Sequence, residues 1–268
     1  MKPMFAVQIS DRDDTDLHMT VNALIQEGLA YDNFGAIYFG GELTNLDAFP
    51  EDRFVIPLCG ISVLNRWLVG ALPSNWKMFY SVQAFDQAVY GKYYGKHMLN
   101  WEAQILDFSE VVDSRWFSDM FIKPTDDLKA FAGLMLPSMQ TLGEALAKTN
   151  HMPIPKDQKV LVGPPVNIGR EFRLFIVNNQ IADACQYRNR GHSSVKEIEM
   201  SLAFEIDAYF KIINELAPAP APVYVIDICE TNDGFKIVEI NCFNCSGMYK
   251  VDRGLVLSEV AHFVEHHL

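Results

Sequence analysis

Residues 223–241, VYVIDICETNDGFKIVEIN, contain two apolar runs separated by a turn sequence. The turn, Asn-Asp-Gly at 232–234, is typical of the connection between two antiparallel strands, so the segment predicts a β-hairpin. A hairpin centred on Asp233 places Asp227 opposite Glu239, because both residues are equally far from the centre in sequence. Directly opposed residues have Cβ atoms about 4.5–5.5 Å apart. The sequence therefore predicts two carboxylates side by side.

Strand alternation adds a third polar group to this pair. Glu239 is expected to share a face with Ile237 and Asn241, because successive side chains point to opposite faces of a strand. Two carboxylates this close repel each other unless a cation lies between them. A set of oxygen ligands from Asp227, Glu239 and Asn241 suits Mg²⁺, or Mn²⁺, better than zinc. A solvated acidic face is the alternative, and a turn shifted by one residue would change the pairing.

A second hairpin and a long helix precede the first hairpin. Residues 172–177 and 181–187 are expected to form strands joined at Asn178 and Asn179. Ser194 followed by Glu197 has the form of a capping box, which predicts that the next helix begins there. The apolar residues of this helix recur at helical spacing: Ile198, Leu202, Ile206, Tyr209, Phe210 and Ile213.

The N-terminal part alternates between strand and helix patterns. Strands are expected at residues 5–9, 36–39 and 54–57, with helices at 16–29 and 61–69. Strands separated by helices imply parallel βαβ units. Neither a Walker P-loop nor a Gly-x-Gly-x-x-Gly fingerprint occurs in this part, so a bound nucleotide would have to be held by other means.

The middle of the chain is less regular. A strand is expected at residues 120–124 and a helix at 134–148. Two prolines indicate a linker at 151–156, and a short strand follows at 160–162.

Composition limits the class of protein. The chain has 268 residues, which suits one large domain or two small ones at roughly 100–200 residues per domain. Its net charge of -12 argues against general nucleic-acid binding, which needs a basic face. No apolar run is long enough for a membrane span, and the N-terminus does not resemble a signal peptide. Five cysteines give no complete disulfide framework, so a cytoplasmic location is expected.

The carboxylate hairpin resembles the metal-binding end of the ATP-grasp family. In that family an acidic residue on one strand and Glu-x-Asn on the next hold the Mg²⁺ ions that bridge the phosphates of ATP. The resemblance therefore implies that Asp227, Glu239 and Asn241 are metal ligands. Glu171 and Arg173 match the family's Glu-x-Arg strand, in which the Glu lies towards the nucleotide and the Arg contacts phosphate or the reacting centre.

Further segments extend the resemblance over about residues 120–251. Val160, Leu161 and Val162 match the family's hinge, whose backbone pairs with the adenine edge. Residues 121–133 match its upstream basic loop, which implies that Lys123 and Lys129 neutralise phosphates. This segment resembles a little-characterised clade in bacterial and phage genomes, which more often has Arg at the position of Lys123. Lys keeps the charge there but loses the two-pronged guanidinium geometry.

The implied fold is α/β, with two ATP-grasp subdomains gripping ATP in residues 99–268 and a hinge near 160–166. A small Rossmann-like, pre-ATP-grasp α/β domain is expected in residues 1–98. The loop after the metal strand would face the substrate, which makes the following residues candidates for substrate contact: Asn244, Ser246 and Gly247.

Several of these residues also have an interpretation that does not involve a ligand. Lys123 and Lys129 could be surface lysines, whereas Arg173 lies in an apolar strand and is expected to be functional or buried in an ion pair. Arg188 follows a strand and is a candidate for contact with ATP or an anionic substrate, or is simply solvated. The Cys-x-x-Cys at 242–245 has no second pair, so zinc or redox roles are not favoured.

The resemblance implies an ATP- and Mg²⁺-dependent ligase that joins a carboxylate to an amine or thiol through an acylphosphate. The carboxylate and amine substrates would be small molecules, peptides or proteins. A kinase-type phosphotransferase on the same fold is one alternative, and a nucleotide-binding or interaction module without turnover is another. The sequence gives neither the substrates nor the oligomeric state.

Overall fold

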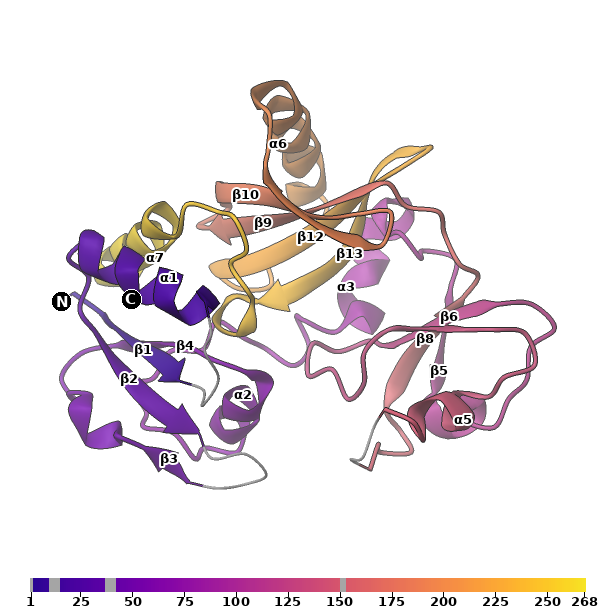
Figure 1. The fold of residues 1–268 in the computed structure, drawn as a ribbon, viewed down its shortest axis with the longest axis horizontal. Helices are drawn as coiled ribbons and strands as arrows, with labels where there is room; N and C mark the ends of the chain where they lie inside the picture. Colours follow the sequence, from indigo (N-terminus) through magenta and orange to yellow (C-terminus); the bar gives the residue numbers. More distant parts are fainter. Residues whose placement is uncertain (1, 10–14, 37–41, 150–152) are drawn as a thin grey trace.

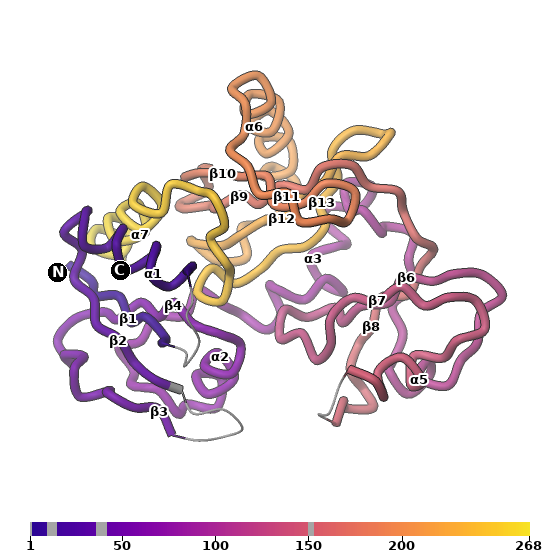
Figure 2. The backbone as a smooth tube through the Cα atoms, in the orientation of Figure 1, coloured from indigo at the N-terminus to yellow at the C-terminus, as the bar shows by residue number. Residues whose placement is uncertain are grey.

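The structure is a computed structural model that describes residues 2–9, 15–36, 42–149 and 153–268. These residues form three β-sheets with helices packed against them, which confirms the expected α/β class (Figure 1). Both termini lie at the same end of the molecule (Figure 2). Among the described helices, none has the length and apolar character that crossing a membrane requires.

The N-terminal sheet has the strand order β3-β2-β1-β4. Its central strand β1 runs parallel to both β2 and β4, as the alternation of strands and helices predicts. The predicted strand at 36–39 meets β2 only at Ala36, and residues 37–39 lie outside the described residues. The elements are β1 (Met4–Ile9), α1 (Thr15–Gln26), β2 (Tyr31–Ala36), β3 (Leu43–Thr44), η1 (Leu46–Ala48), β4 (Val55–Leu58) and α2 (Ile61–Leu68).

The middle of the chain forms a four-stranded sheet with the order β5-β8-β6-β7. Strand β6 coincides with the predicted strand at 120–124, and β8 contains the predicted strand at 160–162. The elements are α3 (Gln87–Tyr94), η2 (Gly95–His97), β5 (Gln104–Asp107), α4 (Phe108–Val111), β6 (Met120–Pro124), β7 (Leu134–Leu136), α5 (Leu142–Leu146) and β8 (Lys159–Gly163).

The predicted helix at 134–148 is wrong in its first half. Residues 134–136 form β7, which pairs with β6, and the helix α5 begins only at Leu142. Pro137 lacks the backbone N–H that a continuous helix would need. Thr141 then starts a new helix, because its hydroxyl accepts from the backbone N–H of Glu144 at 3.1 Å while the Glu144 carboxylate accepts from the N–H of Thr141 at 3.1 Å.

The third sheet is antiparallel and has the order β11-β10-β9-β12-β13. Both predicted hairpins are present in it. Asn178 and Asn179 join β9 to β10 and both have positive φ, which asparagine tolerates better than most residues. The elements are β9 (Arg170–Val177), β10 (Gln180–Asn189), β11 (His192–Glu197), α6 (Met200–Asn214), β12 (Val223–Thr231), β13 (Gly234–Cys242), η3 (Phe243–Cys245) and α7 (Arg253–His267).

The predicted capping box at Ser194 and Glu197 is wrong. Both residues lie in β11, which pairs with β10 after a tight turn at Arg190 and Gly191. Both turn residues have positive φ, which fits a two-residue hairpin loop. Helix α6 begins at Met200. Most of its predicted apolar positions are buried as expected: Leu202, Ile206, Phe210 and Ile213.

The hairpin β12–β13 has the predicted register at its centre, since Asp227 pairs with Glu239. The next pair is Ile228 with Ile237, so Val238 is an extra residue that forms a β-bulge. Beyond the bulge the alternation reverses. Ile237 therefore lies in the apolar core with Ile228 instead of sharing a face with Glu239, which corrects the prediction.

The two faces of this sheet pack differently. One face contributes Phe172, Leu174 and Ile226 to a core that includes α6. Towards the other face, Phe175 and Val225 pack with the C-terminal helix α7 and with residues of β1 and β4. Helix α7 also packs on α1, so the end of the chain fastens the third sheet to the N-terminal sheet (Figures 1 and 2).

Candidate functional site

A cavity of about 490 Å³ lies between the middle sheet and the third sheet. The loop 125–133, the connection 165–168 and the strands β6, β10 and β13 contribute to its wall. The side chains that line it include six that are charged or carry a hydroxyl group and could contact a ligand: Lys123, Lys129, Glu171, Tyr187, Arg188 and Glu239. The structure therefore brings together five of the predicted site residues from distant parts of the chain.

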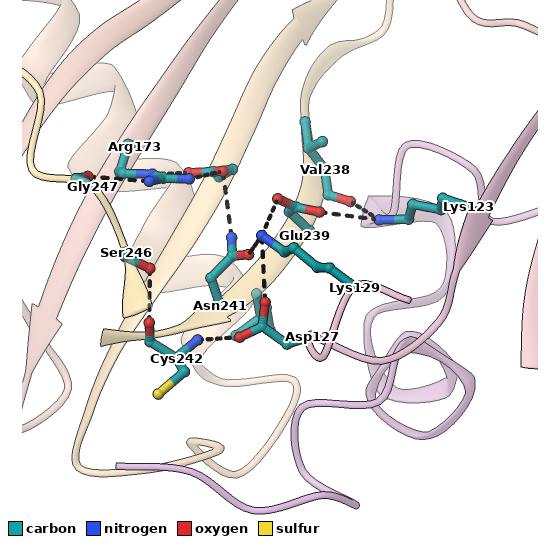
Figure 3. Close-up of polar contacts among 12 residues, drawn as sticks. Lys123, Asp127, Lys129, Arg173, Val238, Glu239, Asn241, Cys242, Ser246 and Gly247 are labelled. Carbon is teal, nitrogen blue, oxygen red and sulfur yellow. Dashed lines mark hydrogen bonds and ion pairs between the residues drawn. The ribbon is translucent and has the colours of Figure 1, made fainter. Parts of the chain in front are cut away.

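Glu239 lies between two lysines. Its Oε2 is 3.5 Å from Nζ of Lys123 and its Oε1 is 3.7 Å from Nζ of Lys129 (Figure 3). Lys123 also donates to the backbone oxygen of Val238 at 3.2 Å, because the bulge turns that carbonyl towards it. Burial raises the pKa of Glu239, but the two lysines outweigh burial and lower it to about 2. Glu239 is thus a carboxylate throughout the physiological range.

Lys129 extends from a loop beside the middle sheet to the end of β13. Its ammonium is 2.8 Å from Oδ1 of Asn241 and 3.5 Å from Oδ1 of Asp127 (Figure 3). Burial lowers the pKa of Lys129, but the neighbouring carboxylates raise it overall, Glu239 more than Asp127. The Lys129 side chain is 45% exposed, so the ammonium can be reached from the cavity.

Arg173 and Asp227 form a closed ion pair. Nε of Arg173 donates to Oδ1 of Asp227 at 2.8 Å and Nη2 donates to Oδ2 at 2.7 Å, while Nη1 donates to the backbone oxygen of Gly247 at 3.1 Å. The two side chains are only 8% and 1% exposed. The guanidinium carbon also lies 5.5 Å and 5.0 Å from the ring centres of Tyr187 and Tyr249. Arg173 was expected to be either functional or buried in an ion pair, and the structure shows the buried ion pair.

Glu171 provides an acceptor at the cavity wall. Its Oε2 accepts from the hydroxyl of Tyr187 at 2.9 Å, whereas its Oε1 is buried without a hydrogen-bond partner among the described residues. Burial raises the pKa of Glu171 despite this hydrogen bond and the charge of Arg188. A buried acceptor without a partner is costly, so Oε1 is ready to accept from a ligand donor.

Arg188 and Arg190 differ in position. Arg188 lines the cavity and is exposed, with its guanidinium 5.8 Å from the ring centre of Tyr187. Arg190 lies in the β10–β11 turn and does not line the cavity. Of these two arginines, only Arg188 is placed to contact a ligand in the cavity.

The predicted hinge at Val160, Leu161 and Val162 does not line the cavity. These residues lie in β8, whose backbone pairs with β5 on one side and with β6 on the other. A strand with both edges paired has no free backbone groups for an adenine ring. The connection that follows β8 lines the cavity instead, through Pro165, Val166 and Ile168.

The loop after β13 is held from within the protein. Asn244 is almost fully buried, and its side chain accepts from the N–H of Phe79 at 2.8 Å and donates to the carbonyls of Pro57 at 2.8 Å and Lys77 at 3.1 Å. Asn244 therefore fastens the loop to the N-terminal part, and both its amide oxygen and its amide nitrogen are hydrogen-bonded within the protein. Ser246 and Gly247 border a separate cavity of about 200 Å³ beside β1, α1 and β4.

Asp127 is a site residue that the sequence reasoning missed. It is only 5% exposed, and its Oδ2 accepts from the backbone N–H of Cys242 at 2.6 Å. Burial raises its pKa to about 6, although Lys129 opposes this shift. Its position two residues before Lys129, in the segment that suggested phosphate binding, was the signal that could have revealed it. Cys242 and Cys245 are both free thiols.

The oxygen atoms at the end of β13 suit a hard cation. Oδ1 of Asn241 and the carboxylate of Glu239 converge on one point, where the Lys129 ammonium now lies. Asp227 gives indirect support, because its Oδ2 accepts from Nδ2 of Asn241 at 3.4 Å and so orients the amide. Among the described residues, no group of three or more acidic, His or Cys side chains is arranged around a metal position. Phosphate oxygens and water would have to complete the shell of a Mg²⁺ ion.

Comparisons with known proteins identify the family and the fold of this chain. The family model described as ATP-grasp domain, R2K clade family 3, matches residues 81–260, which is more than half of the chain. No curated protein is similar enough to this sequence to count as a match.

Solved structures share the fold at low sequence identity. A RimK domain protein ATP-grasp from Sphaerobacter thermophilus is 15% identical, with a TM-score of 0.57, over 97% of this chain and 99% of that chain. The D-alanine–D-alanine ligase from Bacillus anthracis is 11% identical, with a TM-score of 0.57, over 98% and 97%. The same ligase complexed with ATP is 12% identical with the same coverage and TM-score. The fold is thus that of ATP-grasp proteins, and the chain belongs to the ATP-grasp domain family, R2K clade family 3.

Proposed function

We propose that this protein is an ATP- and Mg²⁺-dependent ligase that joins a carboxylate to an amine or thiol through an acylphosphate. The observation that carries the proposal is the cavity in which Glu239 faces Lys123 and Lys129, with the buried Asn241 bonded to Lys129 beside it. The D-alanine–D-alanine ligase with the same fold, which has also been seen with ATP, supports the reaction class.

The cavity suits a nucleotide in size and chemistry. Its volume of about 490 Å³ lies within the usual 300–1,000 Å³ of small-molecule sites. The adenine would lie against the connection 165–168, where apolar side chains face the cavity, and the free Oε1 of Glu171 would accept from a donor on the nucleotide. Lys123, Lys129 and Arg188 would neutralise the phosphates. Residues 99–268 would then grip the nucleotide, with residues 1–98 as the preceding α/β domain.

Glu239 and Asn241 would hold the Mg²⁺, and Asp227 would orient Asn241 and Arg173. A bound Mg²⁺ would supply charge neutralisation at the phosphate oxygens. Arg173 would act by fixing Gly247 and the loop that borders the second cavity, since each of its three nitrogens donates within the protein. Ser246 and Gly247 would then face the substrate.

The reaction needs positioning rather than a protein nucleophile. A carboxylate oxygen of the substrate attacks the γ-phosphorus of ATP, the bond to the β–γ bridging oxygen breaks, and ADP leaves. An amine or thiolate then attacks the acyl carbon and inorganic phosphate leaves. Lys123 and Arg188 stabilise the charge that spreads over the transferred phosphoryl oxygens. Small molecules or peptides with a free carboxylate are the expected first substrates.

Thermal unfolding with ATP plus Mg²⁺, compared with ATP plus EDTA, tests nucleotide binding. Stabilisation should increase with ligand concentration and disappear with EDTA. The Glu239→Gln variant is the matched control and should not be stabilised by the metal. Absence of any shift in the wild-type protein would contradict the proposal.

A second measurement identifies the reaction. ADP release is followed while mixtures of carboxylic acids and amines are added, and the product is analysed by mass spectrometry. An amide or thioester supports the ligase. A stable phosphorylated product would identify a phosphotransferase instead.

A further inference from the structure

Lys129 places a positive charge at the point where the oxygen ligands of β13 converge. Its Nζ is 2.8 Å from Oδ1 of Asn241, 3.5 Å from Oδ1 of Asp127 and 3.7 Å from Oε1 of Glu239 (Figure 3). The ammonium donates to Asn241, and the carboxylates of Asp127 and Glu239 lie at ion-pair distance around it. The ammonium thus has the environment that a small cation would have.

The loop that carries Lys129 is built to keep it there. Lys129 has a positive φ of 53°, which is unusual for a residue other than glycine and indicates that the surrounding structure imposes it. Asp126 fixes the loop, because its Oδ1 accepts from the N–H of Leu128 at 3.0 Å and its Oδ2 accepts from Gln158 at 2.6 Å. Asp127 fixes the loop to β13 through the N–H of Cys242.

Lys123 approaches the same carboxylate differently. Its ammonium lies 3.5 Å from Oε2 of Glu239 and donates to the backbone oxygen of Val238, whereas among the described residues it is Lys129 that bonds to Asn241 and pairs with Asp127. A cation bound by Oε1 of Glu239 and by Asn241 would collide with Lys129 but not with Lys123. The two lysines therefore differ in whether they compete with a metal ion.

We propose that the Lys129 ammonium is an internal placeholder for the metal ion, and that it transfers to the nucleotide phosphates when the metal–nucleotide complex binds. This rests on the proposed function of the site. Asp127 is the positioning residue that holds Lys129 in the nucleotide-free state. Asp127 also keeps a carboxylate near the lysine while it moves.

Coupled binding of metal and nucleotide follows from this arrangement. Without nucleotide, a metal ion has to displace an ammonium that Asp127 and Asn241 hold at the ligand position. With nucleotide, the phosphates accept the ammonium and the oxygens of Glu239 and Asn241 become free. Metal affinity should therefore increase strongly when nucleotide is present, and by reciprocity nucleotide affinity should increase with metal.

Mn²⁺ titration of the nucleotide-free protein, with free Mn²⁺ quantified by electron paramagnetic resonance, tests the placeholder. Lys129→Met should bind Mn²⁺ about tenfold more tightly than the wild type, or better, because a like charge is removed from the ligand position. Lys123→Met is the matched control and should give a smaller gain. An equal or larger gain in the control, or no gain for Lys129→Met, would overturn the proposal. Lys129→Gln provides a second variant if the first does not fold.

Two further measurements test whether the gain in Mn²⁺ affinity arises at this site. The double variant Lys129→Met/Glu239→Gln should lose the gain, and retention of tight Mn²⁺ binding would overturn the assignment to this site. A non-hydrolysable ATP analogue should tighten Mn²⁺ binding more in the wild type than in Lys129→Met. If the analogue does not bind the wild type at all, the proposed function fails; if it binds but the coupling is equal in both proteins, only the placeholder fails.

Discussion

Two carboxylates on neighbouring strands of the third sheet, Asp227 on β12 and Glu239 on β13, differ in how closely their cationic partners bind them. Arg173 and Asp227 are buried and form two hydrogen bonds of 2.8 Å and 2.7 Å. Glu239 is 28% exposed, and its lysines stay 3.5 Å and 3.7 Å away. In the first cluster both carboxylate oxygens of Asp227 and all three nitrogens of Arg173 are hydrogen-bonded within the protein. The second keeps oxygens and ammonium groups that can change partners.

This difference in burial and pairing indicates that one carboxylate stabilises the fold and the other binds ligand. Removing one member of a buried pair leaves a charge without compensation, whereas the members of a partly exposed cluster can be solvated. Asp227 is therefore expected to matter first for stability, and Glu239 first for ligand binding. Four substitutions test this distinction.

Asp227→Asn should have the largest effect on stability. It should lower the free energy of unfolding by about 3–5 kcal/mol, because the Arg173 guanidinium stays buried without a carboxylate. Urea-induced unfolding measures this loss. The control is Glu230→Gln, which removes the more exposed pair with Arg170 and should cost about 0–1 kcal/mol. Equal losses of unfolding free energy in both variants would mean that burial does not make the Arg173–Asp227 pair more important for stability.

Glu239→Gln should show the opposite profile. Turnover measured as ADP release should fall about 100-fold or more, because the carboxylate of the metal site is lost. The free energy of unfolding should change less than in Asp227→Asn, because Lys129 is 45% exposed and the buried Lys123 keeps its hydrogen bond to the backbone oxygen of Val238. A loss of stability as large as that of Asp227→Asn would remove the distinction between the two clusters.

Lys123→Met should weaken nucleotide binding and also slow phosphoryl transfer, because Lys123 is proposed to neutralise the phosphates in both steps. The KM for ATP should increase about tenfold, because one charge-assisted contact to phosphate is lost. Lys123→Arg tests the chemistry of this position, since Arg keeps the charge and adds a second donor direction. If Met and Arg variants have the same KM, charge at this position does not contribute to ATP binding.

Asp127→Asn should change the pH dependence of stability. Burial raises the pKa of Asp127 from 3.8 to about 6, so the folded state binds this proton more tightly than the unfolded state. Its contribution is fully present below pH 3.8 and is lost as the pH rises to about 6. The variant should therefore gain stability relative to the wild type over this interval. A constant difference in the unfolding midpoint between pH 4 and pH 6 would contradict the raised pKa.

The sequence predicted the centre of the site well, because alternation and a symmetric turn are local rules. They placed Asp227 opposite Glu239 and brought Asn241 to the same face. The pairing of Arg173 was expected as one of two possibilities, because a charge in an apolar strand needs a partner. These inferences needed no knowledge of distant contacts.

The predictions that failed concern features that are determined by contacts between distant parts of the chain. Residues 160–162 are apolar and extended, but only the pairing with β5 and β6 shows that their backbone is not free. Pro137 could have warned against one helix over 134–148, whereas the pairing of β7 with β6 could not be foreseen. The position of Asp127 beside Lys129 was visible in the sequence, but its hydrogen bond to the backbone of Cys242 depends on the distant strand β13.

The extra residue at Val238 affects how relatives can be recognised. Without it, regular alternation from Ile237 would point Glu239 into the apolar core and leave the cavity without its carboxylate. A relative could keep Val-Glu-Ile-Asn intact and still lose the site through the deletion of a single residue earlier in the strand. In this chain, the number of residues between the hairpin turn and the motif therefore determines the site as much as the motif does.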